Sequence, residues 1–389
     1  MKDALRVAIE LTDRKVDELS RYRGAPALTI YMPLQTPTAK ASGKQENMIR
    51  FKNLIRRGEG CIESYRGEQQ QQLGTMREML GALSSSIEGG ERLWDPQAAA
   101  IAIFLAPEQI DVVPLSVDVE EEVRIGERFH LKPLFSDRSA SERYFLLALD
   151  LHDVRLYRGN RRNLEEVPLT PAPRPLPAIL ESFDFERSLN KAPGGSTVYV
   201  GHQGGEENLT PHIIEFLQEV DRCLRQTIGE GDSPVLLAGT ENVVGHFRHH
   251  SSVARLHENH LKGSPRSFTV EELHRRSRDM VRQAAQARVD REIEAVEEYL
   301  DSRQGARELE EICSAAFEGR LQLLLVASDT AVHGLFDETS ERLELDERGE
   351  DLLDLAAGHA WSRGTRVYAV PRSRIPRGLP AAGLVHATA

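Results

Sequence analysis

The chain has 389 residues, of which 40% are hydrophobic and 28% are charged, and its formal net charge at pH 7 is −12. This composition is typical of a globular protein and excludes fibrous and disordered classes, while the length allows two or three domains. The acidic balance excludes sequence-independent binding of nucleic acid by the whole surface, but it leaves room for local basic patches.

The sequence favours a reducing, cytoplasmic location. No apolar run approaches the roughly 18 residues of a membrane span, and the first residues, MKDALRVAIELTDRK, lack the apolar centre of a secretion signal. Cys61, Cys223 and Cys313 lie far apart and form no CxxC pair. We therefore expect no membrane partner.

Residues 1–137 are predicted to form an N-terminal α/β domain. Its expected elements are a strand at 25–34, helices at 46–66 and 71–87, and strands at 98–106 and 110–115. The polar stretch SDRSASER (136–143) is interpreted as a linker.

Residues 138–265 are predicted to form a middle domain that begins with three short strands in a meander, YFLLALD, DVRLYRG and LEEVPL. After a proline-rich stretch come the strand TVYV (197–200), a glycine-rich loop, a helix over 211–228 and the buried strand PVLLAGTENVV (234–244). Strand–helix–strand order predicts parallel pairing with a crossover helix.

A second linker, KGSPRS (262–267), precedes a C-terminal α/β/α domain over 266–389. A long helix starts near Thr269, a second helix stops at Gly319, and the apolar strand LQLLLVA (321–327) follows. The last elements are a helix in EDLLDLAAGHAWSRG and the strand RVYAV.

Several stretches, taken as an ordered set, resemble class-1 peptide-chain release factors and their relative Pelota. They are RIGERFHLKPL, YFLLALDLHDVRLYRGNRRNLEEVPL, the glycine-rich loop with its helix, PVLLAGTEN and ELEEICSAAFEGRLQLLLVA. The whole chain is most similar to the bacterial archaeo-eukaryotic release factor families. This resemblance implies a ribonuclease H-like middle domain and a last domain like the kink-turn-binding ribosomal-protein fold. It also implies that the ribosome or tRNA is a partner, with a possible protein partner on the C-terminal domain.

The resemblance places the loop 201–207 where the family carries Gly-Gly-Gln. In that motif the glycines permit unusual backbone conformations, and the glutamine backbone stabilises the oxyanion formed at the peptidyl-tRNA ester. This chain reads Gln203-Gly204-Gly205-Glu206, so a carboxylate stands at the family's glutamine position. Gln203, Gly204 and Gly205 are the catalytic candidates if the protein is a peptidyl-tRNA hydrolase. Repulsion between Glu206 and phosphate instead favours binding without hydrolysis.

Four arginines in the predicted hairpin are the candidate RNA-binding residues. These are Arg155, Arg158, Arg161 and Arg162. Because side chains alternate along a strand, Arg155 is expected on the opposite face from Arg158.

Three other interpretations stay open. A metal-dependent nuclease would use Asp150, Asp153 and Glu241 at the strand ends. A zinc site would draw on the histidines 246, 249, 250, 257 and 260, with His257 and His260 on one helical face. A non-catalytic interaction scaffold is the third. The leading interpretation includes no cofactor and no resident metal.

Overall fold

The computed structural model describes residues 5–7, 11–23, 26–35, 42–65, 70–88, 98–140, 142–174, 176–180, 210–229, 233–338 and 340–386. These residues fall into two compact units. Unit 1 combines residues from 1–141 with residues from 283–389, and unit 2 lies within 142–282.

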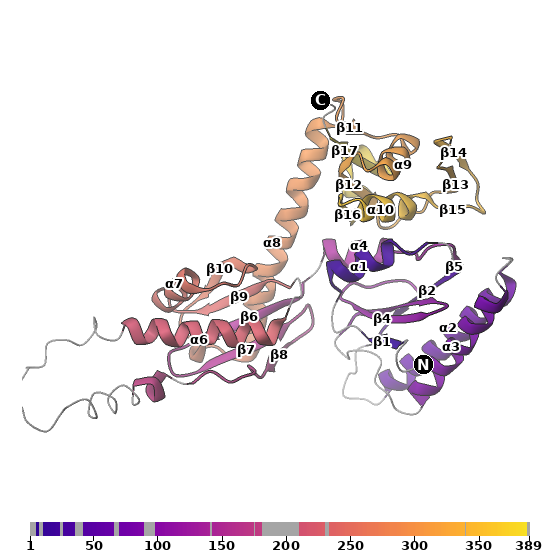
Figure 1. Cartoon of the computed structure of the whole chain (residues 1–389). Coiled ribbons are helices and arrows are strands. Elements are labelled where there is room, and N and C mark those ends of the chain that lie inside the picture. Colours follow the sequence, from indigo (N-terminus) through magenta and orange to yellow (C-terminus); the bar gives the residue numbers. More distant parts are fainter. Residues whose placement is uncertain are drawn as a thin grey trace, which may run out of the picture. The chain divides into compact units, whose positions relative to one another are not determined.

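The first sheet of unit 1 has the strand order β1-β4-β3-β2-β5. Its strands are β1 (Leu5–Val7), β2 (Ala27–Pro33), β3 (Ala100–Ala106), β4 (Gln109–Leu115) and β5 (Glu122–Gly126). The pair β1–β4 is parallel and the other neighbours are antiparallel. The helices α2 (Ser42–Ser64) and α3 (Gln70–Glu88) lie side by side, and their apolar residues pack with those of one sheet face (Figure 1).

The opposite face of this sheet shares a core with the C-terminal part of the chain. Tyr31 and Phe104 from the sheet belong to the same buried cluster as Leu323 and Ala356. The helices α1 (Asp13–Ser20) and α4 (Lys132–Ser139) also contribute to it. This continuous core explains why two segments distant in sequence form one unit.

The C-terminal part of unit 1 contains the sheet β11-β17-β12-β16. Its strands are β11 (Gly305–Ala306), β12 (Leu321–Ala327), β16 (Arg366–Val370) and β17 (Ala381–Val385). The helices α9 (Leu309–Glu318) and α10 (Leu352–Ser362) pack with it. A small antiparallel sheet, β14-β13-β15, comprises β13 (His333–Asp337), β14 (Arg342–Leu345) and β15 (Glu350–Asp351).

Unit 2 is built on a five-stranded sheet with the order β10-β9-β6-β7-β8. The strands are β6 (Tyr144–Leu149), β7 (Val154–Gly159), β8 (Leu164–Val167), β9 (Val235–Gly239) and β10 (Leu256–Lys262). The first three form an antiparallel meander, and β9 and β10 extend the sheet in parallel from β6. This is the strand order of a ribonuclease H-like fold.

Helices cover both faces of the unit 2 sheet. Apolar residues of α6 (Thr210–Ile228) and α7 (Glu241–His250) pack on one face, where Leu147 and Leu237 lie. The other face, with Tyr144 and Leu236, packs against Leu273 and Val281 of α8 (Val270–Tyr299). Figure 1 shows α6 lying along the sheet.

The predicted fold class, α/β with several sheets, is confirmed, but three local predictions need correction. The linker predicted at 136–143 overlaps α4, in which Asp137 and Ser139 are buried. The strand predicted at 234–244 ends at Gly239, and α7 begins at Glu241. The segment with His257 and His260 is the strand β10 and not a helix. The predicted strand 197–200 lies outside the described residues.

The division into three domains stays a prediction. Each predicted domain contains a sheet of its own, while the first and last parts pack together as unit 1. Among the helices of the described ranges, none is long and apolar enough to cross a membrane.

Candidate functional site

The predicted catalytic residues Gln203, Gly204 and Gly205 lie outside the described residues. The described chain resumes at Thr210, the first residue of α6. That helix is fixed on the unit 2 sheet by buried Phe216, Leu217 and Val220. A firmly packed helix therefore follows the loop, as the resemblance implies, but the catalytic assignment stays a prediction.

The four candidate RNA-binding arginines occupy the β7–β8 hairpin. Their neighbours on β7 show which way the side chains alternate, because Leu156 belongs to the core on the α6 face and Tyr157 to the core on the α8 face. Arg158 thus lies on the α6 face of the strand and Arg155 on the α8 face. The predicted split between Arg155 and Arg158 agrees with this geometry.

The exposed guanidinium of Arg155 forms an ion pair with a nearby carboxylate. Its Nε donates to Asp153 Oδ2 at 2.9 Å, and this hydrogen bond raises the pKa of Arg155. Arg161 and Arg162 stand in the turn between the two strands, where Asn160 Oδ1 accepts from the backbone N–H of Arg162 at 2.7 Å. The turn is further held by a 2.9 Å contact between His274 Nε2 and the carbonyl oxygen of Asn160. These two contacts position the backbone of the turn that bears Arg161 and Arg162.

The carboxylates of the nuclease hypothesis are each paired with a different cation. Asp150 Oδ1 lies 3.6 Å from Arg266 Nε, Asp153 pairs with Arg155, and Glu241 Oε1 lies 3.5 Å from Lys262 Nζ. Each carboxylate thus has its own cation. Within the described ranges, no group of three or more His, Cys, Asp or Glu residues is arranged to hold a metal ion.

The five histidines of the zinc hypothesis are divided between two elements. Three lie on α7, where the rings of His249 and His250 are 4.8 Å apart, and His257 and His260 lie on β10. Burial, together with the charges of Arg248 and Lys262, lowers the pKa of His260. Neighbouring cations of this kind also disfavour a bound metal cation.

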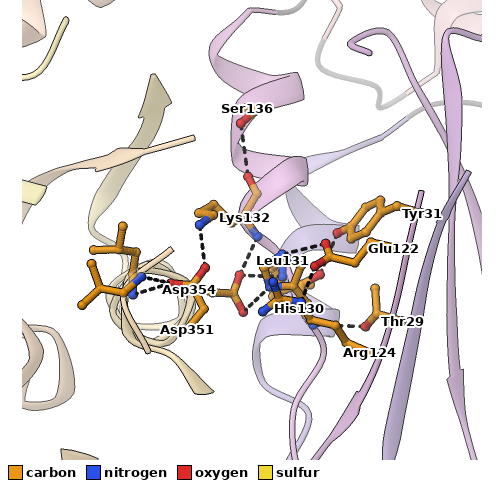
Figure 2. Close-up of polar contacts among 12 residues, drawn as sticks. Thr29, Tyr31, Glu122, Arg124, His130, Leu131, Lys132, Ser136, Asp351 and Asp354 are labelled. Atoms are coloured by element: carbon orange, nitrogen blue, oxygen red, sulfur yellow. Dashed lines mark hydrogen bonds and ion pairs between the residues drawn. The ribbon is translucent and has the colours of Figure 1, made fainter. Parts of the chain in front are cut away.

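A buried polar cluster in unit 1 was not predicted from the sequence. Figure 2 shows it between the start of α4 and the start of α10. Asp354 Oδ1 accepts from the backbone N–H groups of Leu131 and Lys132 at 2.7 and 2.6 Å. These are N–H groups that the helix itself leaves unsatisfied, so a residue of α10 caps α4.

The side chain and backbone of His130 connect the same cluster to the first sheet. Its Nδ1 lies 3.2 Å from Asp354 Oδ2. Its backbone carbonyl accepts from the hydroxyl of Tyr31 at 2.6 Å, and its backbone N–H donates to Thr29 Oγ1 at 3.1 Å. Burial alone would raise the pKa of Asp354, but His130 and the two backbone donors outweigh it, so the pKa is lowered.

Comparison with known proteins gave one family match and several distant structural likenesses. No curated protein sequence matches the chain closely enough to count as a relative. An archaeal translation termination factor, aRF1, is 13% identical, with 97% of this chain and 99% of that chain covered and a TM-score of 0.25. An archaeal Pelota, ribosome-bound and accompanied by ABCE1, is 13% identical over 98% of this chain and 95% of that one, with a TM-score of 0.36.

A third likeness is to Pelota of Archaeoglobus fulgidus, 12% identical over 97% of this chain and 93% of that chain, with a TM-score of 0.28. At these scores the structural likenesses carry no functional argument. The family comparison is more specific, because residues 143–320 match the family described as bacterial archaeo-eukaryotic release factor family 3. This match spans unit 2, residues 201–207 and the hairpin arginines, and it confirms the predicted resemblance of this part of the chain to the bacterial archaeo-eukaryotic release factor families.

Proposed function

We propose that this protein engages the ribosome or a tRNA in the cytoplasm, in translation termination, ribosome rescue or a linked quality-control step. The observation that carries the proposal is the match of residues 143–320 to a release factor family. The matched segment includes residues 201–207, where the resemblance places the family's Gly-Gly-Gln motif. It also includes the arginine-bearing hairpin of unit 2.

The proposed RNA contacts are Arg158, Arg161 and Arg162, with Arg155 contributing from the other face of β7. Arginine is suited to phosphate because its planar guanidinium donates two parallel hydrogen bonds. Local contacts of this kind are compatible with the overall charge of −12, since they require only a basic patch.

We further propose that the loop binds and does not hydrolyse. Glu206 brings a negative charge to the position where the family uses an uncharged glutamine. An acidic side chain near the acceptor end of a tRNA repels phosphate and supplies no amide to place beside the ester. If the protein is active, the reaction is hydrolysis of the peptidyl-tRNA ester.

Ribosome cosedimentation at graded salt tests the proposal. The chain with Arg158→Ala, Arg161→Ala and Arg162→Ala should bind ribosomes more weakly, and each lost phosphate contact should reduce the salt slope by about 1. A matched control is the triple variant Arg222→Ala, Arg275→Ala and Arg282→Ala, which changes the charge equally at three exposed positions of unit 2. Failure of the wild type to sediment with ribosomes at low salt would refute the proposal.

The same experiment also tests the interpretation of the protein as a non-catalytic interaction scaffold. Wild-type binding with an unchanged salt slope in the hairpin variant would assign the association to protein contacts, because phosphate contacts release counterions.

A further inference from the structure

A cavity in unit 1 combines four arginines from three separate stretches of the chain. Its volume is about 560 Å³, which is within the usual range of small-molecule sites. Arg21 and Arg23 follow α1, Arg128 follows β5, and Arg363 follows α10. The tertiary fold thus brings together cations that are up to 342 positions apart in sequence, from Arg21 to Arg363.

The cavity carries a positive excess. Its other charged lining residues are Glu127 and Glu338, which leaves two positive charges uncompensated when the lining histidine, His359, is neutral. Burial, followed by the charges of Arg128, Arg23 and Arg363, lowers the pKa of His359 to about 3. His359 is therefore neutral at physiological pH, so its Nε2 can accept a hydrogen bond from Arg128.

Two of the arginines already have acidic partners. Arg128 Nη2 lies 3.2 Å from Glu338 Oε1, and its Nη1 lies 2.8 Å from His359 Nε2. Arg21 Nη2 pairs with Asp17 Oδ1 at 3.1 Å. Arg128 is thereby held in place against the imidazole at the cavity wall.

Arg23 and Arg363 have no ion pair with any residue of the described ranges. Arg23 is nevertheless oriented, because its Nη1 donates to the carbonyl oxygens of Ser20 and Tyr22 at 2.6 and 2.8 Å. Burial and the nearby charge of Arg128 lower the pKa of Arg23. Arg23 and Arg363 are both exposed, so an anion from solvent can reach them and offset the gathered like charges.

We propose that this cavity binds a small phosphate-bearing anion, with the phosphate between Arg23, Arg128 and Arg363. Guanidinium groups from different segments can donate hydrogen bonds to a phosphate from several sides, whereas a single arginine binds it from one side. The cavity also has an apolar wall, since the ring of Phe317 packs against that of His359 with centroids 5.5 Å apart. A ring attached to the phosphate would find contact there, so a nucleoside diphosphate fits better than the inorganic ion alone.

Isothermal titration of the full chain with pyrophosphate and with adenosine diphosphate tests the site, at constant ionic strength with sodium chloride as the blank. We expect saturable one-to-one binding of both anions. The variants Arg23→Gln and Arg363→Gln should each weaken it by about tenfold or more, the usual effect of removing one charge-assisted hydrogen bond. Arg342→Gln is the matched control, because it removes the same charge from exposed β14, outside the cavity lining.

Comparing the two anions shows whether the cavity recognises a whole nucleotide or only its diphosphate group. Tighter binding of the nucleotide, reduced to the level of pyrophosphate by Phe317→Leu, would support a nucleotide ligand. Equal binding of the two would support a diphosphate group alone. Thermal melting without ligand should be unchanged in Arg363→Gln, which separates lost binding from lost folding.

Absence of binding of both anions at millimolar concentration would overturn the proposal, as would equal weakening by Arg342→Gln. Binding of an RNA oligonucleotide in place of the small anions, abolished by the same arginine variants, would also overturn it. Because the assay uses no ribosome, its failure leaves the proposed function in translation unaffected.

Discussion

The ammonium group of Lys132 lies 2.5 Å from Oδ2 of Asp351, and both side chains are buried. Lys132 Nζ also donates to the carbonyl oxygen of Thr330 at 2.7 Å. Asp351 is at the same time the N-cap of α10, since its side chain accepts from the backbone N–H of Leu353. One ion pair thus joins the first turn of α4 to the first turn of α10 (Figure 2).

Replacing only one residue of this ion pair should lower the free energy of unfolding substantially. Lys132→Met leaves a buried carboxylate without its cation, and a loss of about 3–5 kcal/mol is typical for such a change. Asp351→Asn should be similarly destabilising because it leaves the ammonium buried. The double variant should recover much of the loss, since no unpaired charge remains. Urea unfolding followed by the fluorescence of Trp361, in a Trp94→Phe background, measures all four states of the cycle. Additive losses would contradict a direct pair.

Asp354 should make unit 1 sensitive to acid. Its pKa is lowered in the folded state, so its stabilising contribution is complete above the ordinary carboxyl pKa of about 4. The contribution is lost as the pH falls from there through the lowered folded value, because the unfolded chain binds the proton first. Asp354→Asn should therefore lower the stability at neutral pH and flatten the stability–pH curve below about pH 4. Asp346→Asn, at an exposed turn, serves as the control. If the stability–pH curve of Asp354→Asn below about pH 4 were the same as that of the wild type, this prediction would be wrong.

Gly159 should not tolerate a side chain. A Cβ built on it would lie 2.3 Å from Cζ of Tyr144, the residue opposite it on β6. The Tyr144 ring cannot simply move, because its hydroxyl is 2.6 Å from Ser277 Oγ and the side chain is buried. Gly159→Ala should destabilise unit 2 by about 1–3 kcal/mol or more, as overpacking of a core does.

Gly245→Ala is a control for that change, because a Cβ there would meet no atom within 4 Å apart from those of its neighbouring residues and the backbone of α7. It should stabilise the helix by about 0.5–1 kcal/mol. Thermal unfolding of both variants gives the comparison, and equal melting temperatures would refute the steric argument.

The chemistry of the loop can be tested by restoring the family's motif. Glu206→Gln would make the sequence after Gln203 read glycine, glycine, glutamine. We expect no peptide release above background from the wild type and measurable release from Glu206→Gln in a peptidyl-tRNA assay. Glu207→Gln is the matched control, since it removes the same charge without restoring the motif. Release by the wild type, reduced about 10²–10³-fold by Gly204→Ala or Gly205→Ala, would instead establish an enzyme with Gln203 as its amide.

Much of the fold could be predicted from the sequence because its strands are strongly apolar. The runs at 98–106, 144–150 and 321–327 are almost continuous hydrophobic stretches, and the structure forms β3, β6 and β12 there. The strand β10 was missed for the opposite reason. It lies at the edge of its sheet, and most of its side chains are not buried, so LHENHLK shows no hydrophobic pattern.

The polar stretch 136–143 is predicted as a linker because its residues are polar. In the structure several of these polar side chains are buried and bond to distant parts of the chain. Asp137 Oδ1 accepts from the backbone N–H groups of Ser116 and Val117. Ser139 Oγ accepts from the N–H of Ala369 at 3.1 Å. Partners more than 200 positions away, as for Ser139 and Asp354, leave no local signal in the sequence. The arginine cavity was missed on the same grounds, since its members come from separate stretches.

The cap that Asp354 places on α4 also sets an order of events during synthesis. The backbone donor of Lys132 precedes its acceptor by 222 positions, whereas unit 2 is one continuous segment between them. A ribosome adding about 5–20 residues per second takes roughly 10–45 s to cover that distance. During this interval unit 2 can complete its own core. The sheet face that bears Tyr31 and Phe104 has α1 and α4 available to it, but it still lacks the C-terminal residues of its core. The apolar core of unit 1 is therefore incomplete until α10 has been synthesised.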